Sequence, residues 1–384
     1  MMADDLWRTA ILSSMPRTET SPAEVAIIGA GPIGIEMAAG LKHMGVPYIH
    51  FEAGTIGTTM LWWAPFTRFF SSPERIEICG VPIPSIDQEK TTREEYLAYL
   101  RAVVRQFNLP IHTFTRVNKV ERIDNQFIIH TAASAHGVGD PSDDLSKRLA
   151  SKRGTTDEQM WRVNKLVLAI GNMHRPRLLN VPGEDLPHVS HYFQDPHLCF
   201  GRRVLIVGGR NSAAEAAIRL YRAGAHVAIS YRRPAFDSKR VKYWLRPELE
   251  WLISKMRIQF FPETLVRRID TEVELVRASD CAPAGSIEAD HILILTGYVQ
   301  DCELFEQLGI EVEGEERAPV FNPMTMETSV PGVFIAGTAA SGSPARTTLF
   351  IENTHIHIAR IVRAMTGAEL PWPSGDEYSA LAES

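Results

Sequence analysis

Runs typical of buried strands recur along the chain, and a glycine closely follows each of them. These runs of four or five mainly apolar residues stand at 25–28, 166–170, 204–207, 291–295 and 333–336. Runs of this length, bounded by turn residues, are typical of strands buried on both faces, as in parallel sheets. Apolar residues at helical spacing follow two of the runs, so the pattern predicts an α/β fold in which helices cover parallel strands.

Other segments have clear periodicity of their own. A helix is expected over 93–107, capped by Thr91 or Thr92, because apolar residues recur on one of its faces. Alternating segments at 116–123 and 126–131 predict two strands, and the polar stretch up to about residue 159 predicts a mobile loop. A last helix is expected from about Leu349 to Met365.

The first glycine-rich turn follows the run at 25–28. Gly29, Gly31 and Gly34 have the GxGxxG spacing. In a strand-turn-helix unit such glycines allow a tight turn, close approach of a pyrophosphate and close packing of helix on strand, while the helix N-terminus faces the anion. Glu52 ends the next apolar run, where a carboxylate can accept hydrogen bonds from a ribose. This unit predicts a dinucleotide site.

A second strand-turn-helix unit begins at 204–207 and departs from the pattern. Gly208 and Gly209 remain, but Arg210 takes the third place and Ala213 the sixth. Alanine is tolerated at the last position, because that residue only has to let helix and strand approach. The helix dipole disfavours Arg210 at a helix start unless an anion lies there, which favours a phosphate contact over a solvated charge. The predicted site also includes the neighbouring Asn211 and Ser212.

The residues after the second unit favour NADP over NAD. The strand at 226–230 leads into Arg232 and Arg233, at the place where a carboxylate would indicate NAD. Guanidinium groups suit the additional 2′-phosphate of NADP, whereas a carboxylate would repel it. A solvated basic turn is the alternative interpretation. Two dinucleotide sites in one chain indicate a flavoprotein that also binds a nicotinamide nucleotide.

Composition and charge exclude several classes of partner. The net charge is −6, and no block of lysine and arginine resembles a nucleic-acid-binding stripe. No apolar run approaches membrane-spanning length, and acidic residues near the start argue against a secretory signal. We therefore expect a cytoplasmic protein without nucleic-acid or membrane partners. No metal is expected, because neither a CxxC pair nor a ligand cluster is formed by Cys79, Cys199, Cys281 and Cys302.

Taken in order, the motifs resemble a known family. GAGPIG, LVLAIG, VGGRNSA, LTGY and VPGVFIAGT resemble the thioredoxin-reductase-like flavoproteins with two dinucleotide-binding domains, over about 23–365. Within that group, TRFFSSPERIEICGVPI from Thr67, VSHYFQ from Val189 and TTLFIEN from Thr347 resemble the bacillithiol-disulfide reductase family. The resemblance implies FAD in the first domain and NADPH in an inserted second domain, with hydride passing from nicotinamide to flavin.

The resemblance predicts two Rossmann-like domains, with the NADP-binding domain inserted into the FAD-binding domain. A flexible N-terminal extension is expected at 1–20, followed by the first part of the FAD-binding domain at 21–172. A linker at 173–190 then leads into the NADP-binding domain at 191–297, and the second part of the FAD-binding domain occupies 298–384.

The same resemblance assigns residues to FAD. It implies that Glu52 holds the ribose, that Val120 contacts the adenine through its backbone, and that the helix from about Leu349 points its positive end at the flavin. Trp63 lies where related enzymes place an aromatic beside the isoalloxazine, with a core or surface role as the alternative. The pyrophosphate contacts are Gly29, Gly31, Pro32, Ile33 and Gly34. Further cofactor contacts at strand ends are Gly171, Gly297, Gly337 and Thr338.

One departure from the family affects the expected chemistry. Characterised bacillithiol-disulfide reductases have a cysteine inside the first glycine motif, where this sequence has Ile33. A thiol beside the flavin can form a mixed disulfide with the substrate, whereas isoleucine cannot. Cys79 is the thiol to test, with a buried structural cysteine as the alternative. The expected acceptor is a low-molecular-weight disulfide or a related small molecule.

Other functions remain open. A ferredoxin-NADP reductase of the thioredoxin-reductase type also lacks the cysteine pair and would have ferredoxin as its partner. A flavin monooxygenase-like enzyme would use His191, but Asp185 and Pro187 replace the phenylalanine and glycine of that family's FxGxxxH motif. A non-catalytic NADPH sensor would share the Rossmann domains without the chemistry. Related proteins form homo-oligomers, and we expect the same here.

Overall fold

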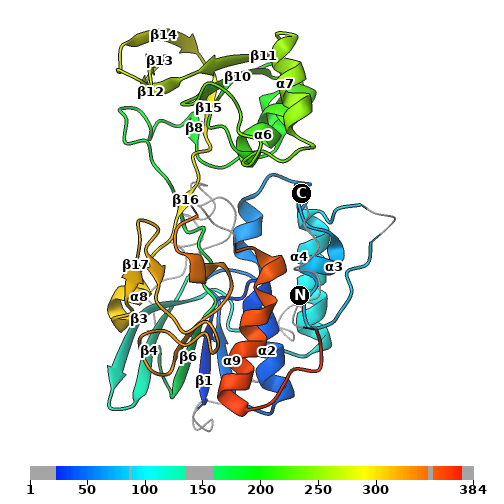
Figure 1. Ribbon diagram of the computed structural model, residues 1–384, viewed down its shortest axis with the longest axis vertical. Helices are drawn as coiled ribbons and strands as arrows, with labels where there is room; N and C mark the ends of the chain where they lie inside the picture. Colours follow the sequence, from blue (N-terminus) through cyan, green and yellow to red (C-terminus); the bar gives the residue numbers. More distant parts are fainter. Residues whose placement is uncertain (1–22, 86–88, 135–158, 345–348, 374–384) are drawn as a thin grey trace, which may run out of the picture.

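Two lobes stacked along the long axis make up the molecule in the computed structural model (Figure 1). The structure describes residues 23–85, 89–134, 159–344 and 349–373. The predicted extension at 1–20 and most of the polar stretch before residue 159 lie outside the described residues.

The first lobe is built on a four-stranded parallel sheet. Its strand order is β19-β6-β1-β2. Strands β1 and β6 are buried along almost their whole length, as their uninterrupted apolar sequences predicted. The bounds are β1 Val25–Ile28, β2 Tyr48–Phe51, β6 Lys165–Leu168 and β19 Val333–Ile335.

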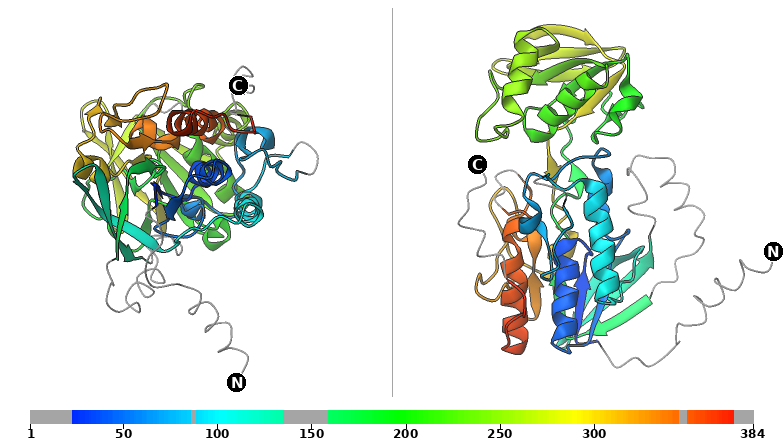
Figure 2. Two further views of the ribbon diagram at one scale, coloured as in Figure 1. Left: turned by 90° about the horizontal axis from the view of Figure 1, so that it is seen from below. Right: turned by 90° about the vertical axis from the view of Figure 1, so that its right-hand side faces the viewer.

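Two helices from opposite ends of the described chain pack together in this lobe (Figures 1 and 2). They are α2 (Pro32–His43) and α9 (His355–Thr366). A Cβ added at Gly40 would lie 3.3 Å from the Val362 side chain, so glycine allows the two helices to approach closely. The prediction of a helix from Leu349 was wrong at its start, because a separate 3-10 turn, η4 (Ile351–Asn353), precedes α9.

A helix and an antiparallel sheet complete the first lobe. Helix α4 (Arg93–Gln106) starts with a capping box between Thr92 and Glu95, which confirms Thr92 as its cap. The antiparallel sheet has the order β3-β4-β5. Its strands are β3 Thr115–Ile123, β4 Gln126–Ala133 and β5 Gln159–Val163.

The second lobe is a second parallel sheet with different layers on its two faces. The strand order is β11-β10-β9-β15-β8. Helices pack on one face and an antiparallel sheet, β12-β13-β14, packs on the other. The helices are α6 Asn211–Arg222 and α7 Arg246–Ser254. The strands are β8 Val189–Ser190, β9 Arg203–Val207, β10 His226–Tyr231, β11 Ile258–Pro262, β12 Thr264–Ile269, β13 Glu272–Arg277, β14 Pro283–Glu288 and β15 His291–Ile294.

The chain crosses between the lobes twice. The crossing segments pair as a short antiparallel ladder of β7 (Arg175–Pro176) and β16 (Tyr298–Val299). The remaining elements are η1 Thr58–Trp62, α3 Pro73–Ile76, η2 Pro196–Cys199, α8 Glu303–Leu308, β17 Val312–Glu313, β18 Ala318–Pro319 and η3 Gly337–Ser341.

The two parallel sheets confirm the predicted α/β fold class. Strands of the first sheet come from both sides of the second lobe in sequence, so the second lobe is inserted into the first. Strand β8, in the segment 173–190 predicted as a linker, pairs with β15 in the second sheet. None of the helices within the described ranges is long and apolar enough to cross a bilayer.

Candidate functional site

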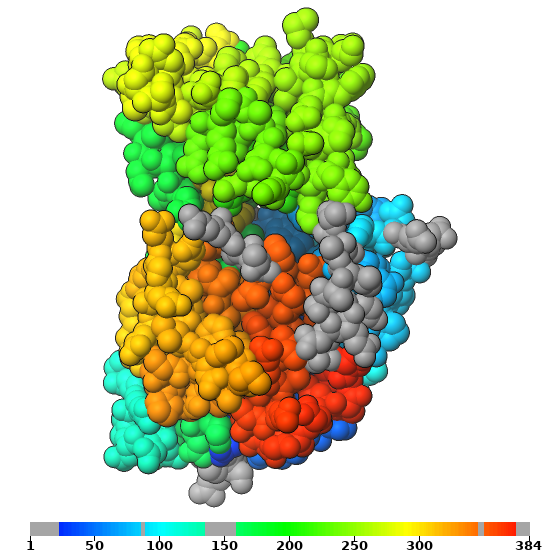
Figure 3. All heavy atoms as spheres, viewed as in Figure 1, coloured from blue at the N-terminus to red at the C-terminus, as the bar shows by residue number. Residues whose placement is uncertain are grey.

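One large cavity connects the two glycine-rich turns. It has a volume of about 1950 Å³, and residues of both lobes line it. In the space-filling view of Figure 3, the surface is recessed where the two lobes meet. Small-molecule sites usually occupy about 300–1,000 Å³, so this cavity has room for two extended nucleotides.

The first glycine turn is packed where the fold needs it and open where a ligand would lie. A Cβ at Gly29 (φ +103°) would lie 2.4 Å from the Ala169 carbonyl oxygen, and one at Gly34 would lie 1.9 Å from the Gly29 carbonyl oxygen. At Gly31 an added Cβ would meet no atom of the described residues within 4 Å. Gly34 therefore packs helix on strand, whereas Gly29, Gly31, Pro32 and Ile33 line the cavity.

The N-terminus of α2 has the features of an anion site. Pro32 occupies the first turn, and that fully described turn contains no acidic residue. Its backbone N–H groups therefore face the cavity without a side-chain acceptor. The neighbouring strand supports the turn, because His50 Nε2 lies 2.8 Å from the Gly29 carbonyl oxygen. This arrangement fits the pyrophosphate of a dinucleotide.

Glu52 lies on the same wall as the turn. Its two carboxylate oxygens accept hydrogen bonds from the N–H groups of Ala30 (2.7 Å) and Gly54 (2.8 Å). Burial raises the pKa of Glu52, and these backbone hydrogen bonds oppose the rise. A carboxylate oxygen can accept more than one hydrogen bond, so Glu52 keeps capacity for a ribose hydroxyl.

The second turn repeats the packing of the first at matching positions. A Cβ at Gly208 (φ +150°) would lie 2.5 Å from the Leu295 carbonyl oxygen, and Ala213 takes the place of the last glycine. Gly209 is required for another reason, since its Cβ would lie 2.3 Å from the Tyr231 ring. Neither Gly208 nor Gly209 lines the cavity, whereas the first residues around the start of α6 do: Arg210, Asn211 and Ser212.

Several arginines gather beside the second turn. The pKa of Arg210 is lowered, first by burial and then by the positive charges of Arg240, Arg232 and Arg233. Asp237 compensates part of this charge, with oxygen–nitrogen distances of 3.4 Å to Arg233 and 3.2 Å to Arg240. Mutually repelling guanidinium groups suit a ligand with a phosphate. Arg232 and Arg233 lie beside the cavity wall rather than on it, whereas Arg240 is part of the wall.

Sequence reasoning missed Arg240 and its neighbours. Lys239 and Lys242 also line the cavity, and the backbone N–H of Lys242 donates to Asn211 Oδ1 at 2.8 Å. The signal was available, because 239–242 is a second basic run shortly after Arg232 and Arg233.

Strand ends from three segments complete the wall. Gly171 and Gly297 have positive φ values of +74° and +101°, and Gly337 has +69°. A Cβ at Gly337 would lie 3.4 Å from the Ile33 side chain, so this glycine packs against the first turn. All three glycines line the cavity, together with Thr338 and Leu349.

Val120, the predicted adenine contact, lies away from the cavity, and the contact stays a prediction. Val120 does not line the cavity, and its N–H donates to Gln307 Oε1 of α8 at 3.0 Å. The first part of β3 forms the wall instead, through Thr115, Arg116 and Val117. A bulge in the β3–β4 ladder directly after Val117 separates the two halves of the strand.

Aromatic side chains form part of the cavity wall. Trp63 lines the wall and contacts Phe69 edge to face, with ring centroids 5.2 Å apart. Trp62 contacts Tyr192 from the crossing segment at 5.8 Å. Trp63 is half-buried, so the structure accommodates a stacked ring as well as the alternative packing role.

No cysteine of the described ranges lies on the wall of the large cavity. Cys79 is 5% exposed, and burial followed by the nearby charge of Glu36 raises the pKa of its thiol. A protonated, buried thiol is a poor nucleophile, which favours the structural alternative for Cys79. Within the same ranges, no group of three or more histidine, cysteine, aspartate or glutamate residues is arranged to hold a metal ion.

His191 lies on the cavity wall in the crossing segment. Its Nε2 is 3.5 Å from Glu184 Oε1, so the ring has a carboxylate neighbour on the linker side. The geometry is compatible with a nicotinamide contact and with a linker histidine.

Comparisons with known proteins agree with this geometry. The family model described as pyridine nucleotide-disulphide oxidoreductase matches residues 26–136 and 150–337. Bacilliredoxin reductase Bdr of Bacillus subtilis (strain 168) is 33% identical over 344 residues, which is 89% of this chain and 97% of that protein. The solved Bacillithiol Disulfide Reductase Bdr (YpdA) from Bacillus cereus superposes with a TM-score of 0.80 at 29% identity, covering 90% of this chain and 99% of the other. A ferredoxin–NADP reductase of Ignicoccus hospitalis (strain KIN4/I / DSM 18386 / JCM 14125) is 24% identical over 319 residues, 82% of this chain and 89% of that protein.

Proposed function

This chain belongs to the pyridine nucleotide-disulphide oxidoreductase family and is Bdr-like within it, and we propose that it is an FAD-dependent reductase that oxidises NADPH. The electrons pass to a low-molecular-weight disulfide, as the name of the Bacillus cereus relative indicates, or to a related small acceptor. The observation behind this proposal is the single cavity that reaches both glycine turns.

The family implies a flavin and a nicotinamide nucleotide, which supply the hydride acceptor and donor when bound. The chain's own residues bind and orient them. Gly31 and the start of α2 bind the first pyrophosphate, and Glu52 accepts a ribose hydroxyl. The arginines beside Gly209 bind a 2′-phosphate, which selects NADPH over NADH.

The thiol chemistry of the proposed reaction differs from a mixed-disulfide mechanism. Ile33 and Gly337 occupy the wall together, and no described cysteine shares that wall. A disulfide substrate would therefore receive electrons without a covalent bond to this chain, or the thiols of another protein would take part.

A second candidate is a ferredoxin-NADP reductase. The similarity to the Ignicoccus hospitalis protein over most of both chains, together with the absence of a cysteine on the described wall, favours it over the monooxygenase and sensor alternatives. A homo-oligomer in the cytoplasm is part of the main proposal, because the resemblance implies the oligomer and the sequence predicts a cytoplasmic protein.

Rapid anaerobic mixing tests the proposal. NADPH should bleach the flavin absorbance of the purified protein faster than NADH does. Bacillithiol disulfide, ferredoxin and oxygen, added next in separate reactions, should then show which acceptor restores the absorbance. Restoration by disulfide supports the main proposal, and restoration by ferredoxin alone supports the second candidate. A protein that takes up no flavin on reconstitution would overturn both.

A further inference from the structure

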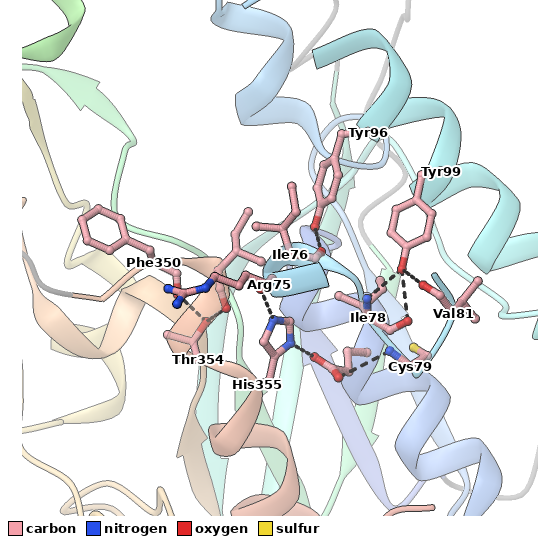
Figure 4. Close-up of polar contacts among 12 residues, drawn as sticks. Arg75, Ile76, Ile78, Cys79, Val81, Tyr96, Tyr99, Phe350, Thr354 and His355 are labelled. Atoms are coloured by element: carbon pink, nitrogen blue, oxygen red, sulfur yellow. Dashed lines mark hydrogen bonds and ion pairs between the residues drawn. The ribbon is translucent and has the colours of Figure 1, made fainter. Parts of the chain in front are cut away.

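A buried acid–histidine pair lies behind the first glycine turn. Glu36 Oε2 of α2 and His355 Nδ1 of α9 are 2.7 Å apart, although the residues are 319 positions apart in sequence. The Glu36 and His355 side chains are only 3% and 4% exposed. Figure 4 shows the His355 ring, at the start of α9, between Glu36 and the segment of Arg75.

The hydrogen bonds around the pair indicate where its protons lie. His355 Nε2 is 3.2 Å from the Arg75 carbonyl oxygen, which can only accept, so Nε2 carries a proton. The Cys79 N–H donates to Glu36 Oε1 at 3.4 Å, so the other oxygen, Oε2, is the one that faces Nδ1. Nδ1 then also carries a proton, which gives an imidazolium facing a carboxylate. Burial lowers the pKa of His355, but Glu36 and the Arg75 carbonyl outweigh burial and the net pKa is raised.

The pair lies directly behind the wall of the large cavity. Helix α2, helix α3 and the start of α9 converge on the pair. Each also contributes one residue to the cavity wall that is close in sequence to a residue of the pair or to Arg75: Ile33, Ile76 and Thr354. Tyrosines of α4 hold the middle segment in place. Tyr96 donates to the Ile76 carbonyl at 2.6 Å, and the Tyr99 hydroxyl accepts from the Ile78 N–H at 2.7 Å (Figure 4).

Other charged or titratable groups face the pair from each element that packs against it. The segment after α3 contributes Glu77, whose charge raises the pKa of His355, and Cys79. A separate cavity of about 20 Å³, room for roughly one water, touches the pair on the side of Glu74 and Glu77. On α9, burial lowers the pKa of His357, and the charges of Arg360 and His355 lower it further. Arg75 Nη1 lies 4.0 Å from Glu352, and the α4 tyrosines complete the surroundings.

Stability of the helix does not explain this pair. His355 is the first residue of α9, where the helix dipole opposes a positive charge. Buried ion pairs also rarely stabilise a fold more than apolar residues of the same volume would. The position behind the cavity wall suggests that the charge serves the group bound in front of it.

We propose that Glu36 and His355 are positioning residues for the flavin, which rests on the proposed function. The imidazolium adds to the positive potential at the start of α9, and the carboxylate holds and balances that charge. Together they set how strongly the protein favours the reduced, more negative flavin over the oxidised flavin.

The test is the midpoint potential of the protein-bound flavin from pH 5.5 to 9 in single variants. In Glu36→Gln the histidine keeps its hydrogen bonds and gains a charge only at acidic pH, so the potential should rise above wild type there. In His355→Gln the carboxylate is unbalanced at alkaline pH, so the potential should fall. Each shift should correspond to about a tenfold change in the preference for reduced over oxidised flavin.

Two further variants separate charge from structure. His357→Gln removes a neutral buried histidine from the same helix and should leave the potential at the wild-type value. The double variant, Glu36→Gln with His355→Gln, lacks the imidazolium that adds to the positive potential, so its potential at pH 7 should lie below that of wild type, and equality with wild type would overturn the proposal. If His355→Gln does not fold, the acid-side rise in Glu36→Gln alone decides the test.

Opposite shifts in the two single variants support the proposal. Shifts in the same direction, or none in either variant, overturn it and leave the pair a link between helices. In protein without flavin, nitrogen NMR of His355 should show a doubly protonated ring at pH 7, and a neutral ring would also overturn it. Failure to bind flavin at all is a different result, because it would overturn the proposed function instead.

Discussion

At the scale of one residue, a substitution at Gly31 should affect ligand binding much more than folding. Gly31→Ala should destabilise the flavin-free protein by less than about 1 kcal/mol, because the new Cβ meets no described atom within 4 Å. The Cβ would enter the space of the pyrophosphate, so FAD affinity should fall at least about tenfold. Fluorescence titration of FAD and thermal unfolding without FAD measure the two effects.

Gly34→Ala is the matched comparison for that test. Its Cβ would lie 1.9 Å from the Gly29 carbonyl oxygen, so this variant should lose stability with or without FAD. Equal FAD affinity in Gly31→Ala and wild type would contradict the placement of a pyrophosphate at this turn.

The basic turn gives a second residue-scale prediction. Replacing Arg232 and Arg233 by alanine should reduce the preference for NADPH over NADH by tenfold or more, because guanidinium–phosphate hydrogen bonds contribute about 1.5–3 kcal/mol each. Steady-state kcat/KM for both nucleotides measures the preference. Arg268→Ala, which removes an exposed arginine paired with Asp270 in the same lobe, is the control. An unchanged preference in the double variant would leave the solvated basic turn as the explanation.

Backbone geometry explains the residue type at several predicted glycines, whereas their predicted cofactor contacts stay predictions. Gly29, Gly34 and Gly208 follow from the sequence because a side chain at any of them would collide with backbone. The place of Val120 away from the cavity could not be predicted, because the bulge after Val117 has no signal in the alternating pattern. The contribution of Arg240 depends on a turn whose path the sequence does not reveal.

At the scale of elements, strands and helices were easier to predict than their contacts. The apolar runs predicted every strand of the first parallel sheet and the helix capped by Thr92. The predicted start of the last helix was wrong by several residues. Residues 349–354 have the apolar spacing of a helix, but they form part of the cavity wall. The contact of Glu36 with His355 depends on the packing of α2 on α9, which neither local pattern contains.

Buried neutral histidines on these elements predict acid sensitivity. Burial lowers the pKa of His50 on β2 and of His357 on α9 to about 4 in each case. The unfolded chain binds these protons near pH 6.5, so stability should be full above that pH and fall as pH drops toward 4. Each of the two histidines should lower the free energy of unfolding by an amount on the order of 3 kcal/mol as the pH drops from 6.5 to 4.

Urea unfolding of the flavin-free protein at several pH values measures this loss. His357→Gln should show a smaller fall in unfolding free energy than wild type between pH 6.5 and 4. An exposed histidine of the second lobe, His226, provides the control, since His226→Gln should follow the wild-type curve. Parallel curves for His357→Gln and wild type would contradict a neutral His357 in the folded protein.

At the scale of the whole molecule, the sequence predicted the insertion but not how the lobes meet. The order of strands along the chain is enough to place the second lobe inside the first, because each return strand ends in a glycine. Arg219, however, has the helical spacing of a surface ion pair with Glu215. In the structure it reaches across to the other lobe, a role that depends on the orientation of two rigid bodies.

Arg219 should control how the lobes are held together. Its guanidinium donates to the Pro65 carbonyl and, at 3.0 Å, to Thr67 Oγ1, and it lies 5.2 Å from the Phe193 ring centroid. Hydrogen bonds of a charged group contribute about 1.5–3 kcal/mol, so Arg219→Ala should speed amide exchange at residues 64–70 roughly tenfold to a hundredfold. Arg222→Ala removes an arginine from the same helix that pairs with Glu248 within its own lobe, and it should leave exchange at 64–70 unchanged. Equal exchange in all three proteins would show that other contacts hold the lobes, and the aromatic contact of Trp62 with Tyr192 would be the next to remove.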